Sequence, residues 1–291
     1  MTHFVSLRRA SFAAAALSGI VLSNASAFAD GMADAVARGS LRIGIAEENF
    51  VPWLATTKAG DRMGYEVDIA KGVAGALELE PVLVEMPFDQ LLRGLTIGKV
   101  DVVISGMSVS AERAREVLFT APYSVTDFKL VMDTSDLPGG AADNGYDVAG
   151  IKLGVADNTL ADDAASAEFQ EAELVRFSDE GDLRDAFLDG KVNGVIAPTP
   201  YPEFIVSRDP DKYVAEDAPL VTTVQAMAVR PDSQRFVNFL NAWLLENTAN
   251  GTLEDIREHW FEGLEWLDQL DGYDPEATPS STEDDKSGTA N

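Results

Sequence analysis

Cysteine is absent from the 291 residues, and histidine occurs only twice. Without cysteine, the fold has neither disulfides nor thiolate metal sites. His3 lies in a leader-like segment, and His259 stands beside Trp260 in an apolar-faced helix, where a surface position is expected. The sequence therefore predicts no metal centre, no cofactor and no catalytic nucleophile–base pair, and stability must rest on the hydrophobic core.

Positive charge is also scarce. Twenty-two lysines and arginines stand against 49 aspartates and glutamates, which gives a formal net charge of −27. Negative charge of this size repels nucleic acid and anionic lipid, so neither is an expected partner. We interpret the acidic residues as a solubilising surface.

Long apolar runs are missing, which argues against a transmembrane helix. The apolar stretch Phe12–Leu22 is short, follows Arg8 and Arg9, and precedes a small-residue cleavage motif, Ala27-Phe28-Ala29. These features predict a signal peptide over residues 1–29 and export to the periplasm, with the Sec and twin-arginine routes both open. No cysteine follows the cleavage motif, so a lipid anchor is not expected.

Strand and helix signals alternate through the rest of the chain. Strands are predicted at 41–45, 81–86, 100–104, 128–132, 151–156, 174–177, 190–196 and 224–229, and helices begin near 64, 88, 157, 178, 233 and 252. This alternation is typical of parallel sheets with right-handed crossovers and predicts an α/β fold. A loop rich in Gly, Asp and Pro at 136–147 separates two such series, and the polar segment 274–291 is predicted to be a disordered tail.

An internal repeat supports two similar lobes rather than one large sheet. Gly98-Lys99-Val100-Asp101-Val102-Val103-Ile104 aligns without a gap with Gly190-Lys191-Val192-Asn193-Gly194-Val195-Ile196. Each segment follows an amphipathic helix and leads into a turn at the edge of a sheet.

The turn after the first repeat, Ser105-Gly106-Met107-Ser108-Val109-Ser110-Ala111-Glu112-Arg113, has the chemistry of an anion receptor. It follows a buried strand and leads to a predicted helix start at Ser110, so it presents unpaired backbone N–H groups. Arg113 adds a planar two-pronged donor that suits a carboxylate. The alternative interpretation is an ordinary strand–turn–helix connection with a surface arginine.

Six segments in order carry a family resemblance over about 220 residues. They are 41–44 (LRIG), 64–68 (GYEVD), 98–101 (GKVD), 105–113 (SGMSVSAER), 121–123 (APY) and 152–155 (KLGV). With them the chain resembles the periplasmic solute-binding proteins that deliver polar amino acids to ABC importers. The resemblance implies a two-lobed α/β fold, two crossing strands that form a hinge, and a ligand cleft between the lobes. It places lobe 1 at 30–126 with a C-terminal return over 230–273, and lobe 2 at 127–229.

The same resemblance assigns roles to individual residues. Arg113 corresponds to the arginine that clamps a ligand carboxylate, and Ser105, Gly106 and Ser108 complete that clamp. The remaining candidates are Phe50 and Phe88, which sandwich the ligand side chain, Trp53 beside them, Asn158, Thr159 and Thr199 on the second lobe, and Glu47 or Glu48 for distal polar groups.

Two positions depart from the family pattern. Leu160 replaces a second hydroxyl, and Pro198 stands where an acid normally binds the α-ammonium group. Since a buried ammonium without a carboxylate costs several kcal/mol, either Glu47, Glu48 or Glu203 substitutes, or the ligand is not an ordinary α-amino acid.

The function implied is a monomeric, non-enzymatic binding protein. It captures a small carboxylate-bearing solute by lobe closure and hands it to ABC permease subunits in the inner membrane. Two alternatives stay open: a cleft dehydratase acting on a cyclic carboxylate, similar to cyclohexadienyl dehydratase, and a periplasmic ligand sensor.

Overall fold

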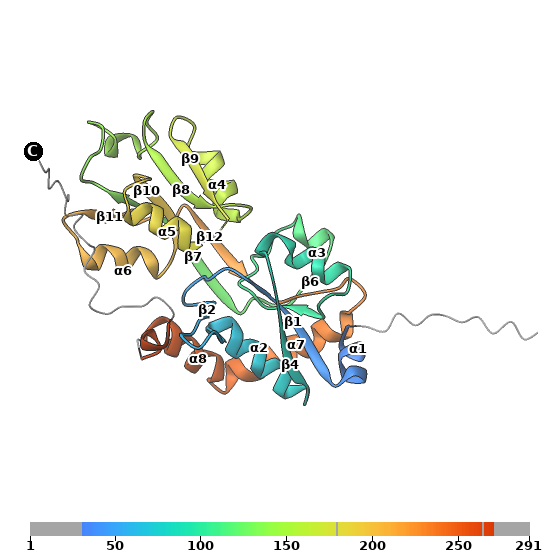
Figure 1. Cartoon of the computed structure of the whole chain (residues 1–291). Coiled ribbons are helices and arrows are strands. Elements are labelled where there is room, and N and C mark those ends of the chain that lie inside the picture. Colours follow the sequence, from blue (N-terminus) through green and yellow to red (C-terminus); the bar gives the residue numbers. More distant parts are fainter. Residues whose placement is uncertain (1–30, 179, 264, 271–291) are drawn as a thin grey trace, which may run out of the picture.

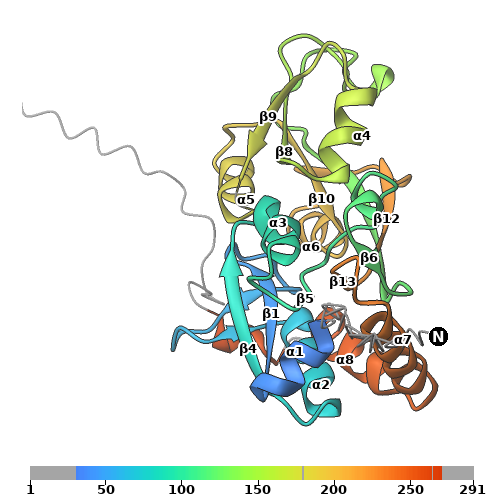
Figure 2. The same ribbon diagram turned by 90° about the vertical axis from the view of Figure 1, so that its right-hand side faces the viewer.

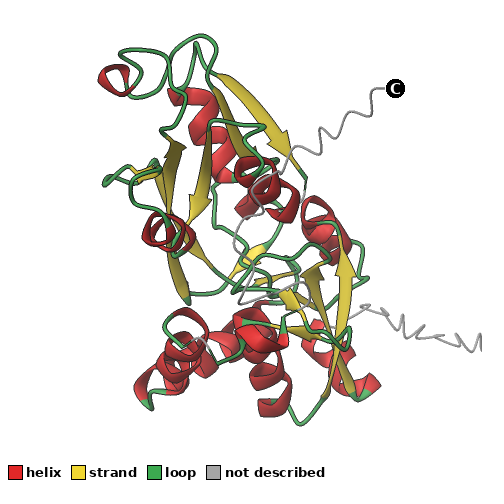
Figure 3. Ribbon diagram, turned by 60° about the vertical axis from the view of Figure 1, so that its left-hand side comes forward, coloured by secondary structure: helices red, strands yellow, loops and turns green. Residues whose placement is uncertain are grey.

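The computed structural model describes residues 31–178, 180–263 and 265–270, and it has two lobes (Figure 1). Each lobe is built on its own sheet, with helices flanking the strands (Figure 3). This arrangement confirms the predicted two-lobed α/β fold. The predicted signal peptide and the predicted tail at 274–291 lie outside the described residues.

The sheet of lobe 1 has the strand order β4-β1-β5-β13-β6. Its strands are β4 (Glu80–Met86), β1 (Ser40–Ala46), β5 (Val102–Val103), β13 (Ala228–Val229) and β6 (Leu118–Phe119). Strand β1 pairs in parallel with β4 and β5, whereas β13 runs antiparallel to β5 and β6. A small hairpin, β2 (Ala55–Thr56) and β3 (Arg62–Met63), lies beside it.

The helices of lobe 1 are α1 (Gly31–Arg38), α2 (Tyr65–Ala76), α3 (Leu91–Thr96), α7 (Gln234–Ala249) and α8 (Thr252–Phe261), with 3-10 turns η1 (Phe88–Gln90), η2 (Arg113–Arg115) and η4 (Leu267–Gln269). Helices α7 and α8 pack against α2, although they come from opposite ends of the chain (Figures 1 and 2). Phe236, Leu240 and Trp243 of the helix predicted to begin near 233 are buried there.

The sheet of lobe 2 has the order β11-β7-β10-β8-β9, and β12 pairs with β7. Its elements are the strands β7 (Ser124–Asp133), β8 (Lys152–Ala156), β9 (Glu173–Phe177), β10 (Gly194–Pro198), β11 (Tyr213–Ala215) and β12 (Val221–Gln225), the helices α4 (Leu160–Glu168), α5 (Glu180–Leu188) and α6 (Tyr201–Arg208), and the 3-10 turn η3 (Ala142–Asn144). Strand β8 is parallel to both β9 and β10.

Strands β7 and β12 connect the lobes (Figure 1). They pair antiparallel from Ser124↔Gln225 to Phe128↔Val221, and the Thr126 hydroxyl donates a buried 3.2 Å hydrogen bond to the Gln225 side chain. The crossing strands predicted at 128–132 and 224–229 are therefore present: β7 contains the first and extends past both of its ends, and β12 begins three residues before the second.

Two local predictions were wrong or incomplete. The helix expected after Ser110 is only the 3-10 turn η2: the Ser110 hydroxyl accepts the N–H of Arg113 at 3.1 Å, but the chain then turns to bury Val117. Helix α6 was not predicted, although Pro200 and Pro202 are compatible with a helix start, where the missing N–H costs nothing.

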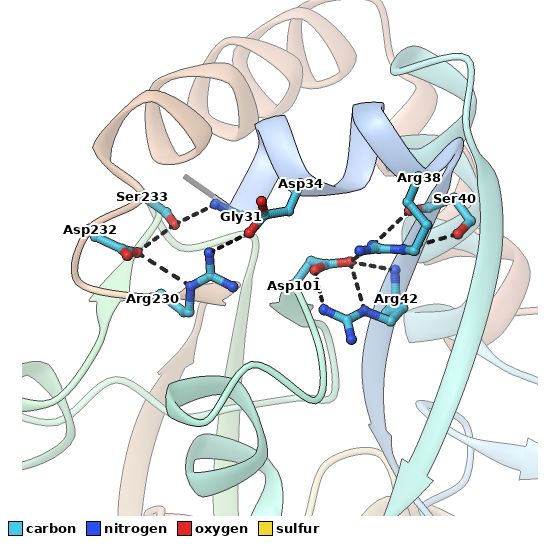
Figure 4. A network of polar contacts seen from close by, with 9 residues as sticks. All are labelled: Gly31, Asp34, Arg38, Ser40, Arg42, Asp101, Arg230, Asp232 and Ser233. Carbon is cyan, nitrogen blue, oxygen red and sulfur yellow. Dashed lines mark hydrogen bonds and ion pairs between the residues drawn. The ribbon is translucent and has the colours of Figure 1, made fainter. Parts of the chain in front are cut away.

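A polar network joins α1 to the neighbouring elements of lobe 1 (Figure 4). The fully buried Asp101 carboxylate accepts hydrogen bonds from the Arg38 and Arg42 side chains and from the backbone N–H of Arg42. Beside it the N–H of Gly31 donates to the Ser233 hydroxyl at 3.0 Å. These contacts tie α1, β1 and the start of α7 to the base of β5. Asp101 therefore has a structural role.

Within the described part of the chain, no helix combines the length and the apolar character needed to cross a bilayer.

Candidate functional site: a cavity between the lobes

A cavity lies between the two lobes and is lined by both. Lobe 1 contributes Ala46, Glu48, Asn49, Phe50, Trp53, Leu54, Phe88, Ser105, Gly106, Ser108 and Arg113; the second side is formed by Phe128, Ala156, Asp157, Thr159, Leu160, Ser178 and Glu180. Ala46 ends β1, and Ala156 ends β8. The cavity thus sits at the carboxyl ends of parallel strands, where α/β sheets commonly bind ligands.

Arg113 joins the two sides of the cavity. Its Nη1 donates to the Ser108 carbonyl at 2.8 Å, and its Nη2 donates to the Asn158 carbonyl of the other lobe at 3.4 Å. Burial lowers the pKa of Arg113, while Asp163 and Glu112 oppose that shift. Arginine nonetheless stays protonated, and it has more N–H donors than these two contacts use, so the group can also hold a carboxylate.

The loop at residues 105–108 is held firmly under the cavity. The Ser105 hydroxyl accepts the N–H of Ala46 at 2.9 Å, and Ser108 forms a bridge with Gln225 of the crossing strand. Gly106 has φ +63°, which an L side chain rarely adopts. The predicted Gly-x-Ser turn is therefore present and faces the cavity.

Aromatic side chains form the apolar walls. The rings of Phe50 and Trp53 lie 4.8 Å apart, and Trp53 packs edge-on against Phe261 at 4.9 Å. Phe88 belongs to another segment, and the centre of its ring lies 5.9 Å from the guanidinium carbon of Arg113. All three predicted aromatic residues line the cavity.

Thr159 lines the cavity from lobe 2 and caps α4. Its hydroxyl donates to the Ala156 carbonyl at 2.8 Å and accepts the N–H of Asp162 at 3.1 Å. Thr159 is therefore both a helix cap and a cavity residue, as its candidate position on the second lobe predicted in part.

Three predicted residues lie outside the lining. Glu47 is exposed, and the neighbouring Glu48 lines the cavity instead. Asn158 is exposed with φ +58°, so only its backbone carbonyl reaches Arg113. Thr199 follows β10, where its N–H donates to the Asp127 carbonyl at 2.9 Å. A shift of one residue along a turn or strand end reverses the direction of the side chain, and sequence alone did not fix it.

The acidic group of lobe 2 lies at a position that sequence reasoning missed. Glu180, the first residue of α5, is only 7 % exposed and lines the cavity. Glu203, one of the expected substitutes, instead pairs with Lys129 at 2.8 Å, with half of its side chain exposed. The sequence feature that could have identified Glu180 is its position just after Ser178, at the end of the parallel strand β9. The other lining residues that were not named as candidates are Ala46, Asn49, Leu54, Phe128, Ala156, Asp157 and Ser178.

Behind the 105–108 loop, Glu66 is completely buried. Its Oε2 accepts a 2.6 Å hydrogen bond from the Tyr123 hydroxyl. Burial raises the pKa of Glu66 to about 7, and the hydrogen bonds from Tyr123 and from the Gly106 backbone partly offset that rise. Across the described residues, no group of three or more histidine, aspartate or glutamate side chains is arranged to hold a metal ion.

Two lobes joined by paired strands, with a guanidinium, aromatic walls and carboxylates facing one cavity, define a protein that binds a small solute between its lobes. Residues 41–263 match the bacterial extracellular solute-binding proteins, family 3, and the chain belongs to this family. The resemblance noted from the six sequence segments is thereby confirmed.

Individual relatives are similar over most of their length. The L-arginine-binding protein of Pseudomonas aeruginosa is 30% identical over 232 residues, which cover 76% of this chain and 87% of the relative. An amino acid ABC transporter substrate-binding protein of Streptococcus pneumoniae, solved with L-arginine, has a TM-score of 0.68 at 26% identity and covers 79% of this chain and 98% of its own. A Wolinella succinogenes protein in complex with lysine has a TM-score of 0.72 at 28% identity, with coverage of 79% and 99%.

Proposed function

We propose that the protein captures an amino acid with a cationic side chain in the periplasm and delivers it to an ABC permease. The observation that carries this proposal is the charge of the cavity. The described residues that line the cavity include one guanidinium, that of Arg113, and three carboxyl groups, those of Glu48, Asp157 and Glu180. A ligand with one carboxylate and two cationic groups matches this set, whereas a dicarboxylate would add to the negative charge.

Each part of such a ligand has a partner. The ligand carboxylate binds Arg113 and the backbone N–H groups of the 105–108 loop. The α-ammonium binds Glu180, which supplies the acid that Pro198 cannot. The side chain passes between Phe50 and Phe88, whose faces attract a cation, and its charged end reaches Glu48.

The names of the relatives support the same ligand class, since they bind arginine or are solved with arginine or lysine. We assign the lobes as 30–126 with 230–273, and 127–229, and we expect a monomer without a cofactor that closes on its ligand. The relatives are binding proteins of ABC importers, which favours capture and delivery over the dehydratase alternative.

Calorimetric titration with arginine, lysine, ornithine, glutamate and a cyclic carboxylate such as prephenate tests the proposal. Saturable binding is expected for the cationic amino acids, together with a rise in melting temperature that grows with ligand concentration. Binding confined to glutamate or to prephenate would refute the proposed ligand class.

A further inference from the structure

A second contact between the lobes lies beside the cavity, on helix α5. Nη2 of Arg184 donates to the carbonyl of Val51 at 3.1 Å. Val51 belongs to lobe 1 and sits in the turn that carries Phe50 and Trp53. The contact therefore connects the helix that begins with Glu180 to the segment that forms an aromatic wall.

The partners of Arg184 within lobe 2 hold its guanidinium in place. Its Nε lies 3.9 Å from Oε2 of Glu180, four residues earlier on the helix, and its guanidinium carbon lies 4.8 Å from the centre of the Tyr201 ring. The side chain is 19% exposed. Since both partners belong to the same lobe, they can position the guanidinium before the lobes meet.

The acceptor on lobe 1 is equally well fixed. Phe50 and Leu54 exchange backbone hydrogen bonds of 2.7 and 2.8 Å across the turn. The carbonyls of Pro52 and Trp53 accept the N–H groups of Tyr65 and Glu66 at the start of α2, both at 3.1 Å. The Val51 carbonyl therefore projects from a rigid part of lobe 1.

We propose that Arg184 is a latch that fastens the lobes together when they close on a ligand. Within lobe 2, Glu180 and Tyr201 hold the guanidinium ready, and closure adds the hydrogen bond to Val51. Glu180 lines the cavity and also lies against Arg184, so the group that receives the ligand cation and the group that fastens the lobes form one unit. This inference rests on the proposed function, because a latch matters only in a protein that closes on its ligand.

The absence of cysteine allows a direct test with the full-length mature chain. Fluorophores on Thr96→Cys in lobe 1 and Ser207→Cys in lobe 2, both exposed positions, report the separation of the lobes by single-molecule energy transfer. Arg184→Met should lower the closed fraction with and without arginine, and in stopped-flow experiments it should release arginine about tenfold faster, the usual effect of losing a hydrogen bond from a charged group.

Arg208→Met is the matched control. Arg208 is exposed on the same lobe, with its guanidinium carbon 5.7 Å from the Phe204 ring, and it does not line the cavity. Its substitution should leave the closed fraction and the release rate unchanged. Arg184→Lys keeps the charge beside Glu180 but lacks the forked donor, so it should fall between wild type and Arg184→Met, and it serves if the methionine variant unfolds.

The outcomes separate the latch from the proposed function. Failure of the wild type to bind any cationic amino acid refutes the ligand class, while the closed fraction of the ligand-free variants still tests the latch. A closed fraction and release rate that match wild type in Arg184→Met and Arg184→Lys would overturn the latch, as would a wild-type protein that never closes.

Discussion

The hydroxyl of Tyr123 donates a 2.6 Å hydrogen bond to Glu66, a carboxyl group buried completely behind the turn that carries Ser105 and Ser108. Burial disfavours the charged form of Glu66, and it also raises the pKa of Tyr123 well above its usual value. The pair therefore makes the support of the binding loop sensitive to pH.

Glu66 should make the free energy of unfolding fall as the pH rises. Its pKa increases from 4.5 in the unfolded chain to about 7 in the fold, so its stabilising contribution is complete below pH 4.5 and is lost as the pH rises through 7. The loss is on the order of 3 kcal/mol. Urea unfolding of wild type and Glu66→Gln at pH 5 and pH 8 measures it. An equal decrease in both proteins would mean that Glu66 is not the titrating group.

Arg113→Met should weaken the binding of arginine by roughly a hundredfold or more, because it leaves the ligand carboxylate buried without its cation. The melting temperature of the ligand-free protein should change little. Arg115→Met provides the control, since Arg115 lies two residues away in the same 3-10 turn and is exposed. Calorimetric affinities decide the outcome, and equal affinities for the two variants would count against the carboxylate clamp.

Glu180→Gln should weaken the binding of arginine by about 10-fold to 100-fold. It should weaken the binding of 5-guanidinopentanoate, which lacks the α-amino group, much less, because there only the positioning of Arg184 by Glu180 is lost. Glu203→Gln is the matched control, because that glutamate pairs with Lys129 away from the cavity. If both ligands lose affinity equally, Glu180 does not bind the ligand ammonium, and its effect on binding passes through Arg184 or through another part of the ligand.

Gly106→Ala should destabilise the protein by about 1–2 kcal/mol, because φ is +63° at this position. It should also weaken ligand binding, since the distorted turn carries the N–H groups of the carboxylate site. Gly139→Ala is a suitable comparison: a methyl group there meets nothing within 4 Å. Unfolding curves and titrations of the two variants should diverge, and coincident curves would contradict the role of the left-handed turn.

The residues that sequence could predict are those next to strand ends with a strong local signal. Ser105 and Arg113 belong to the turn segment that follows β5, and Phe88 follows the end of β4. All three residues line the cavity. Glu180 could not be reached in the same way, because comparison with the family directed the search for an acid to position 198, on a different strand. Only the packing of α5 against the sheet brings Glu180 to the cavity.

The fold was predictable to a similar extent. Apolar periodicity identified α7 and α8, since a buried helix face repeats in the sequence. The α1 helix was missed: it is short and is held to the rest of lobe 1 by the Asp34–Arg230 pair and by the bond from Gly31 to Ser233. Such long-range contacts leave no local pattern.

The bond from Gly31 to Ser233 has a consequence for the order of folding. The two residues are 202 positions apart, and the Trp260 indole likewise donates to Asp68 across 192 positions. Closing loops of this length costs entropy and slows folding, so lobe 1 cannot be completed until α7 and α8 have joined it. The continuous lobe 2 has no such requirement. Lobe 2 can therefore acquire its native structure first, which leaves the completion of lobe 1 as the slow step of folding.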